Sequence, residues 1–109
     1  MTSPAPNRRV TARRACRLNV RYRAAGDWHP ATAMDLSARG CRLRVGESLP
    51  RGRPLQVIFE VPLRDGASAP AVEVAADVVW SRAEGLSHQV GLAFAESPPA
   101  LHEVLAALA

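Results

Sequence analysis

Apolar side chains alternate with polar or small ones along most of the chain. In the first such stretch, residues 15–23, the apolar positions are separated by arginine or asparagine. A period of two residues is typical of a β-strand that buries one face and exposes the other. The same pattern predicts six short strands, which cover residues 15–23, 28–36, 41–45, 55–61, 72–80 and 90–94.

Turn-forming residues stand between these stretches. Six short strands joined by turns predict a small antiparallel barrel or sandwich, and a barrel would remove exposed strand edges. The end of the chain follows a helical period instead, with Ser97 as a suitable N-cap and Pro98 as a suitable first helical residue. We expect this helix to pack on the barrel or on a partner through an apolar face of Leu101, Val104, Leu105 and Leu108.

Length and composition narrow the class of protein. A chain of 109 residues with 48% hydrophobic residues fits one globular domain and excludes a wholly disordered protein. No apolar run approaches the ~18 residues of a membrane-spanning helix, so we expect no membrane insertion. The N-terminus lacks the apolar core of a secretory signal, which favours a cytoplasmic protein. We expect a flexible basic arm at residues 1–14 and one folded domain at residues 15–109.

The basic residues are unevenly distributed. All 14 are arginines, and the first 26 residues hold seven of them and no acidic residue, whereas the remainder holds seven arginines and ten acidic residues. A GC-rich genome would explain the missing lysines but not this asymmetry. An acid-free arginine segment indicates an anionic partner, because guanidinium groups bind phosphates and carboxylates through paired hydrogen bonds.

The residue types that carry most enzyme and metal chemistry show no useful spacing. Cys16 and Cys41 form no Cys-x-x-Cys pair, and both fall at apolar strand positions, so we expect buried thiols. His29, His88 and His102 show neither metal-ligand spacing nor a catalytic pattern. The sequence therefore predicts a binding protein that is not an enzyme and that has no metal and no cofactor.

One short motif stands out between the second and third predicted strands. Asp35, Ser37 and Gly40 form an Asp-x-Ser-x-x-Gly pattern, which places a carboxylate and a hydroxyl on the same side of an extended chain. The glycine then allows a sharp turn or the close approach of a ligand. A side-chain-stabilised turn that binds no ligand is the alternative. The basic arm adds an Arg-x-x-x-Arg pair, Arg9 and Arg13, which can fold over a ligand on the barrel wall.

Together these motifs resemble those of the PilZ domain, a family of bacterial cyclic di-GMP receptors. The family carries Arg-x-x-x-Arg before its first strand and Asp/Asn-x-Ser-x-x-Gly between its second and third strands. The late segments Val-Val-Trp at residues 78–80 and Gln-Val-Gly-Leu-Ala-Phe at residues 89–94 also look like the family's late strands. The resemblance extends from residue 8 to residue 94. It implies an all-β fold, a six-stranded antiparallel β-barrel with a short C-terminal α-helix.

The resemblance also implies roles for the motif residues. Arg9 and Arg13 would contact the phosphates and guanines of cyclic di-GMP, since guanine O6 and N7 are paired acceptors that fit arginine. Asp35 and Ser37 would accept from the N1–H and N2–H edge of a guanine. Gly40 would keep a Cβ away from the ligand.

Four further residues are candidates for the same site. The resemblance suggests that Arg8, directly before the arginine pair, favours an intercalated ligand dimer over a single molecule. Arg42 and Arg44 face outward beside the motif and can form a basic rim, with plain solvated charge as the alternative. Trp80 can stack on a guanine, but its place in the alternation matches the inward-facing valines of its strand, so we expect it in the core.

The resulting prediction is a receptor or adaptor domain whose contact with an unidentified effector protein changes when cyclic di-GMP binds. The resemblance implies a role in motility, polysaccharide or biofilm regulation. One alternative is a nucleic-acid-binding barrel, but such barrels usually add aromatic stacking platforms, and only 5% of this chain is aromatic. The other alternative is a PilZ domain that has lost the ligand and acts in protein interaction through its C-terminal helix.

Overall fold

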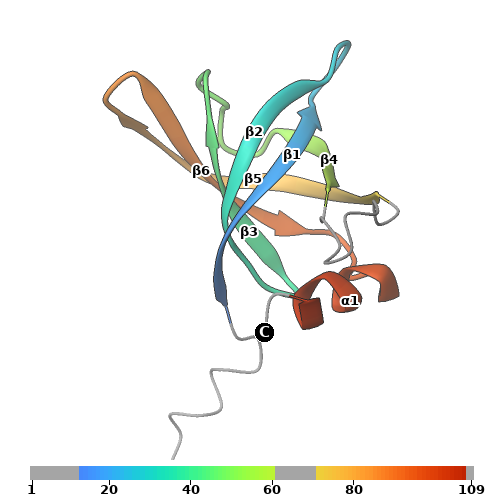
Figure 1. Cartoon of the computed structure of the whole chain (residues 1–109). Coiled ribbons are helices and arrows are strands. Elements are labelled where there is room, and N and C mark those ends of the chain that lie inside the picture. The colour runs from blue at the N-terminus through green and yellow to red at the C-terminus, as the bar shows by residue number, and fades with distance from the viewer. Residues whose placement is uncertain (1–12, 61–70, 108–109) are drawn as a thin grey trace, which may run out of the picture.

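The chain forms a closed six-stranded barrel followed by one helix. The structure is a computed structural model that describes residues 13–60 and 71–107. All neighbouring strands are antiparallel, and their order around the barrel is β1-β2-β3-β6-β5-β4, with β4 returning to β1 (Figure 1). The predicted all-β, six-stranded fold is confirmed. The elements are β1 (Arg14–Arg23), β2 (His29–Leu36), β3 (Gly40–Val45), β4 (Pro54–Phe59), β5 (Val72–Glu84), β6 (Ser87–Phe94) and α1 (Pro99–Ala107).

The alternating apolar residues fill the inside of the barrel. Leu43, Val57, Phe59 and Val90 have no exposed surface, and they come from three different strands. The arginines between the apolar positions of β1 face solvent. The expected burial of the thiols is confirmed for Cys41, whereas the other thiol, in β1, is only half-buried. The period of two residues therefore predicts correctly which face of most strands forms the core.

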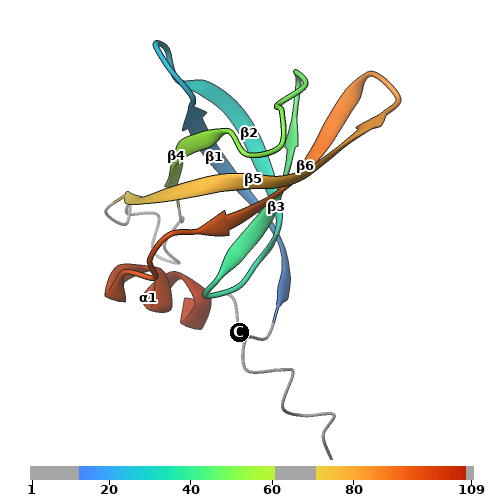
Figure 2. The ribbon, with the colours of Figure 1, turned by 180° about the vertical axis from the view of Figure 1, so that it is seen from behind.

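Helix α1 covers the lower end of the barrel, beside the start of β3 (Figure 1 and Figure 2). Leu101 and Val104 are buried in the same core as the strand residues, so the predicted packing of the helix on the barrel is confirmed. The helix begins at Pro99, one residue later than expected. The Ser97 hydroxyl does not cap the helix as predicted. It donates instead to the carbonyl of Ala38 at 2.7 Å, which links the start of the helix to the β2–β3 corner. In the described part of the chain, no helix is long and apolar enough to cross a membrane.

The hairpin of β5 and β6 is longer than predicted. The expected strands end at residue 80 and resume at residue 90, but the pairing continues to Glu84 and Ser87 around a turn of Gly85 and Leu86. The sequence between residues 81 and 89 is mostly polar, so its alternation carries no signal of burial. Gly85 supplies the positive φ, 62°, that this tight turn requires. As a result the hairpin extends away from the barrel (Figure 1).

Candidate functional site

Asp35 reaches the outer wall of the barrel through a bulge in β2. Ala33 and Leu36 are both fully buried, although an unbroken alternation would place them on opposite faces. The register with β3 shifts between Ala33 and Asp35, which makes Met34 an extra residue in β2. Bulges re-aim the side chains that follow them. Asp35 therefore faces outward, opposite Arg42 of β3.

Two arginines from different parts of the chain bind the Asp35 carboxylate. Arg13 Nη1 donates to Oδ1 at 2.6 Å, and Arg42 Nε lies 3.3 Å from Oδ2. The Asp35 side chain is 17% exposed and that of Arg13 is 57% exposed, so Arg13 is the partner that solvent can replace most easily. The buried Arg42 Nε makes no hydrogen bond to any described residue. Charge attraction, rather than an aligned hydrogen bond, holds Arg42 beside the carboxylate.

Ser37 stabilises the corner between β2 and β3. Its hydroxyl oxygen accepts from the backbone N–H groups of Arg39 and Gly40, each at 3.2 Å, and its backbone N–H donates to the Gly40 carbonyl at 2.9 Å. The residue is 3% exposed. These contacts are those of the side-chain-stabilised turn considered as the alternative for the motif. A role of Ser37 toward a ligand stays a prediction.

Gly40 is required by the packing of β3 against β6. A Cβ added to Gly40 would lie 2.1 Å from the backbone oxygen of Leu92, far inside van der Waals contact. The obstacle is backbone, which cannot swing away as a side chain can. The structure thus gives this glycine a reason that involves no ligand, and its predicted contact with a ligand stays a prediction.

Trp80 lies on the outside of the barrel, and the prediction of core packing is wrong. The register between β5 and β6 shifts between Val78 and Trp80, so a bulge reverses the direction of the side chains that follow. Val78 is buried, whereas Trp80 is 39% exposed. The indole lies directly over Gly91, where a Cβ would come within 2.1 Å of its Nε1.

Strand pairing puts these outward-facing residues in one row across the wall. Asp35 pairs with Arg42, Arg42 pairs with Gly91, and Gly91 pairs with Trp80. The row therefore joins a carboxylate, a guanidinium group and an indole on four neighbouring strands. Together with Arg13, which binds Asp35 at one end, we call Asp35, Arg42, Gly91 and Trp80 the wall site.

Two more arginines flank the wall site. Arg44 is exposed on β3, two residues after Arg42 and on the same outer face. Arg82 places its guanidinium carbon 5.6 Å from the Trp80 ring centroid, a cation–π distance. Sequence reasoning missed Arg82, and the signal that could have found it is the Gly85 turn, which extends the hairpin past Trp80. Arg8 and Arg9, two of the predicted ligand residues, lie outside the described residues.

The thiols near the wall site are poor nucleophiles. Burial, and secondarily the negative charge of Asp35, raise the pKa of Cys16 and of Cys41 above the ordinary thiol value. A thiol with a raised pKa holds little of the reactive thiolate. Within residues 13–60 and 71–107, no group of three or more His, Cys, Asp or Glu side chains could hold a metal ion.

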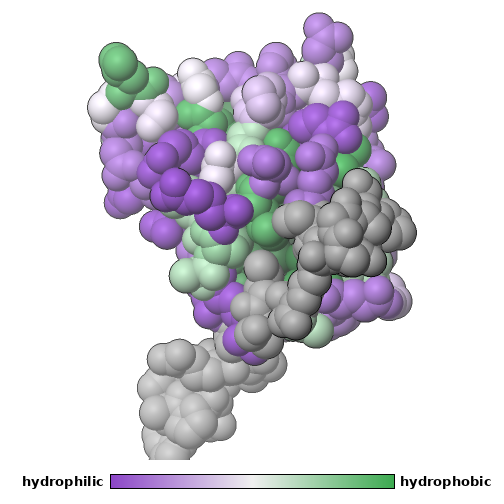
Figure 3. All heavy atoms as spheres, in the orientation of Figure 1, coloured by the Kyte–Doolittle hydropathy of each residue, from purple (hydrophilic) through white to green (hydrophobic). Residues whose placement is uncertain are grey.

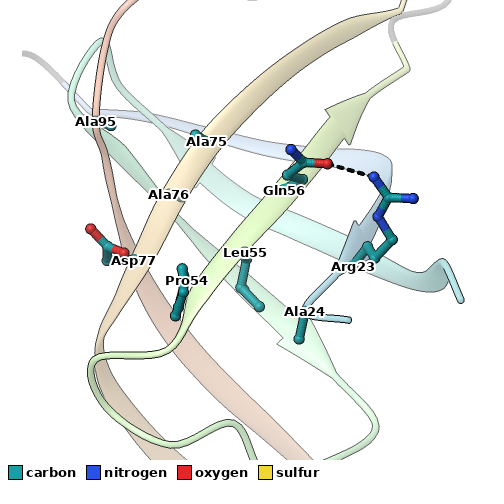
Figure 4. A pocket seen from close by; sticks show the side chains of 9 residues that line it. All are labelled: Arg23, Ala24, Pro54, Leu55, Gln56, Ala75, Ala76, Asp77 and Ala95. Carbon is teal, nitrogen blue, oxygen red and sulfur yellow. Dashed lines mark hydrogen bonds between the residues drawn. The ribbon is translucent and has the colours of Figure 1, made fainter. Parts of the chain in front are cut away.

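A separate hollow of about 430 Å³ is lined mainly by residues of β4 and β5 (Figure 4). Its lining includes small residues such as Ala75 and Ala95 and none of the candidate ligand residues. Arg23 at its rim already donates to Gln56 at 2.8 Å and stacks on Trp28 at 4.6 Å. The chemistry of the wall site, with cations and a flat ring around a carboxylate, fits an anionic ligand with planar bases better than this hollow does.

Solved structures share the fold. The Bacillus subtilis inhibitor of motility MotI/DgrA aligns with a TM-score of 0.77 and 19% identity over 93% of this chain and 49% of that chain. The PilZ domain of Escherichia coli YcgR, solved with c-di-GMP, aligns with a TM-score of 0.68 and 12% identity over 93% of this chain and 88% of that chain. A Xanthomonas campestris protein described as a tetrameric PilZ domain assembled via a helical bundle aligns with a TM-score of 0.53 and 26% identity. The alignment covers 74% of this chain and 45% of that chain. This chain spans about half the length of the Bacillus and Xanthomonas chains.

The sequence itself matches one family over nearly its whole length. A search of the curated proteins found no match. The family profile described as PilZ domain matches residues 7–109, which include both motifs, all six strands and the helix. The barrel, the β2–β3 corner and the family match agree, and the chain belongs to the PilZ domain family, whose members are regulatory binding domains.

Proposed function

We propose that this domain is a receptor for cyclic di-GMP, and that the wall site together with the basic arm binds the ligand. The observation that carries the proposal is the contact between Arg13 and Asp35. These residues belong to two separate motifs, 22 positions apart in the sequence. Their side chains meet at a distance of 2.6 Å between Arg13 Nη1 and Asp35 Oδ1. The relative YcgR has a PilZ domain solved with c-di-GMP, which supports the choice of ligand.

Ligand binding exchanges partners at the Asp35 carboxylate. Both of its oxygens face arginines in the free domain. A guanine edge donates through N1–H and N2–H, so it can replace Arg13 at Asp35 while Arg13 moves to the O6 and N7 acceptors or to a phosphate. Arg42 stays beside the carboxylate. The exchange replaces one charge-assisted hydrogen bond by several, and a bidentate arginine–guanine contact discriminates by about 1–3 kcal/mol.

The remaining wall residues bind the rest of the ligand. The Trp80 indole is a flat surface for a guanine ring, and Arg42, Arg44 and Arg82 are cations for the two phosphates. Arg8 and Arg9 contribute from the arm, where Arg8 favours an intercalated ligand dimer.

The readout of binding is a change at the surface. The β2–β3 corner that carries Asp35 is also tied to the start of α1 through Ser97 and Ala38. Movement of Arg13 and of the arm therefore changes both charge and shape next to the helix. In this proposal the domain acts as an adaptor for an effector protein in the cytoplasm, in motility, polysaccharide or biofilm regulation, and it is not an enzyme.

The two alternatives have less support. The low aromatic content argues against a single-strand nucleic-acid surface. A ligand-free interaction domain that works through the apolar face of its helix has to use a face whose residues Leu101 and Val104 are already buried in the barrel core.

Calorimetric titration with cyclic di-GMP, GTP and a short oligonucleotide tests the proposal. We expect saturable binding of cyclic di-GMP alone, at micromolar affinity or tighter. Arg13→Ala and Asp35→Ala should each weaken binding about 5- to 150-fold, the equivalent of about 1–3 kcal/mol. Arg17→Ala is the matched control, because Arg17 is exposed on β1 and also forms an Arg-x-x-x-Arg pair with Arg13.

Two results would contradict the proposal. Unchanged affinity in both folded variants would remove the wall site from ligand binding. Tighter binding of the oligonucleotide, with a steep loss of affinity as salt rises, would favour the nucleic-acid alternative.

A further inference from the structure

Among the described residues, no strand pairs with one edge of β5 beyond Val78. β4 pairs with β5 only from Val72 to Asp77. At Val78 the backbone N–H and C=O are bonded to Arg53 and Gly52. From residue 79 to residue 84 the only described partner of β5 is β6, on its other side. The barrel is closed, but this extension of β5 is an open edge, which is the part of a sheet that can add another strand.

The geometry of the hairpin identifies which backbone groups face this edge. Glu84 and Ser87 close a two-residue turn, and the closing pair of such a hairpin is hydrogen-bonded to each other. Backbone groups alternate in direction along a strand, so residue 82, like Glu84, is bonded to β6. The N–H and C=O groups of Ser81 and Ala83 therefore point to the open edge.

Apolar side chains are concentrated on the same hairpin. Among the described residues, all three exposed large hydrophobic side chains, Val79, Trp80 and Leu86, belong to it, and Leu86 is fully exposed. Figure 3 shows hydrophobic surface at the end of the hairpin, at upper left. A cleft of about 480 Å³ lies beside this edge, between the hairpin and the β3–β4 loop; its lining includes Leu49, Pro50, Val79 and Ala83. Exposed apolar groups beside an open strand edge mark a surface for protein association.

We propose that two copies of this chain pair through the open β5 edges, antiparallel and about a two-fold axis at Ser81. In this register Ser81 faces Ser81 of the second copy and exchanges backbone hydrogen bonds with it. Val79 of each copy lies beside Ala83 of the other, and Trp80 lies beside Arg82 of the other. One element thus contributes the same surface to both sides, as a two-fold interface requires.

Complementarity of the side chains favours a second copy of the chain as the partner and also favours this register. An axis at Arg82 would put two guanidinium groups directly opposite each other, which is destabilising across strands. An axis at Ala83 would allow only three residues of each strand to pair before the turn at Gly85 is reached. The axis at Ser81 instead pairs apolar with apolar and a cation with an indole, and Trp80 and Arg82 already approach each other within one copy at 5.6 Å. It also carries Leu86 of each copy toward the β3–β4 loop of the other.

Sedimentation analysis of the whole chain tests the interface. We expect a reversible dimer that dissociates on dilution, and at least tenfold weaker association in both Ser81→Pro and Arg82→Glu. Ser81→Pro removes a donor that faces the open edge, and Arg82→Glu tests the side-chain contact without altering the backbone. Arg17→Glu makes the same charge change on β1 and should leave dimerisation unchanged. Circular dichroism confirms that each variant is folded.

Cross-linking tests the register. Ser81→Cys should form a disulfide-linked dimer on mild oxidation, with residue 81 joined to residue 81 in the peptide masses. Glu73→Cys is the control, because Glu73 is exposed on the same strand where β4 covers the edge. A wild-type protein that stays monomeric at millimolar concentration overturns the proposal. So does a dimer that persists in both edge variants, equal cross-linking at residues 73 and 81, or an edge that binds only a different protein.

Discussion

Substituting Gly40 by alanine separates two explanations of the motif glycine, a packing requirement and a ligand requirement. A Cβ at this position would lie 2.1 Å from the Leu92 oxygen, whereas ordinary contacts begin at 3.4 Å. β3 and β6 would have to separate by more than an ångström, at a point where Phe94 N–H donates to the Arg39 carbonyl at 2.8 Å. Overpacking costs about 1–3 kcal/mol, and a lost hydrogen bond adds about 1 kcal/mol. We therefore expect Gly40→Ala to lower the free energy of unfolding by about 2–4 kcal/mol.

Urea unfolding followed by circular dichroism measures this loss, and Gly46→Ala is the matched control. A Cβ at Gly46 would meet nothing within 4 Å, and its backbone lies outside the left-handed region. Alanine there should leave stability unchanged or raise it by up to about 1 kcal/mol, because it restricts the unfolded chain. If Gly40→Ala is as stable as Gly46→Ala, the packing explanation is refuted. If it is also deficient in binding cyclic di-GMP while stable, the glycine is there for the ligand.

Three further predictions test the site and the core. Ser37→Ala removes the acceptor of two N–H groups in the β2–β3 corner, the buried one of Gly40 and the part-buried one of Arg39, and should cost about 1–3 kcal/mol in urea unfolding; no loss would contradict the corner's hydrogen bonds. Gly91→Ala should displace the Trp80 indole, weakening cyclic di-GMP binding in calorimetry while stability changes little. Burial, and then the hydrogen bond to Glu47, raise the pKa of Tyr22 above its ordinary 10.0. Tyr22, the chain's single tyrosine, should therefore show no tyrosinate absorbance just above pH 10 while folded, and stability should fall as pH rises there because only the unfolded phenol ionises. Ionisation of the folded protein at the ordinary pKa would refute this, and Tyr22→Phe should reduce the slope.

The barrel was predictable because its core depends on a simple alternation. The interior positions of β1, β3 and β4 and the first half of β5 follow the period of two residues, and each was assigned to the correct face. The helix was predictable from its own period. The ends of the β5–β6 hairpin were not, because residues beyond the barrel have no buried face to leave a pattern. That extension is stabilised by cross-strand pairing and by polar contacts such as Gln89 to Glu84.

The wall site was predictable only in part, and its two bulges explain which part. From buried Ala33, strict alternation would point Asp35 into the core, and from buried Val78 it would do the same to Trp80. A bulge turns each of these side chains to the outer wall, where strand pairing places them in the same row. An unpaired carboxylate in an apolar core is costly, so an aspartate at an inward position signals that the alternation breaks there. A tryptophan is also common in protein cores, so nothing at Trp80 reveals its bulge. The alternation pattern therefore signals the outward position of Asp35 at one end of the site but wrongly places Trp80, at the other end, in the core.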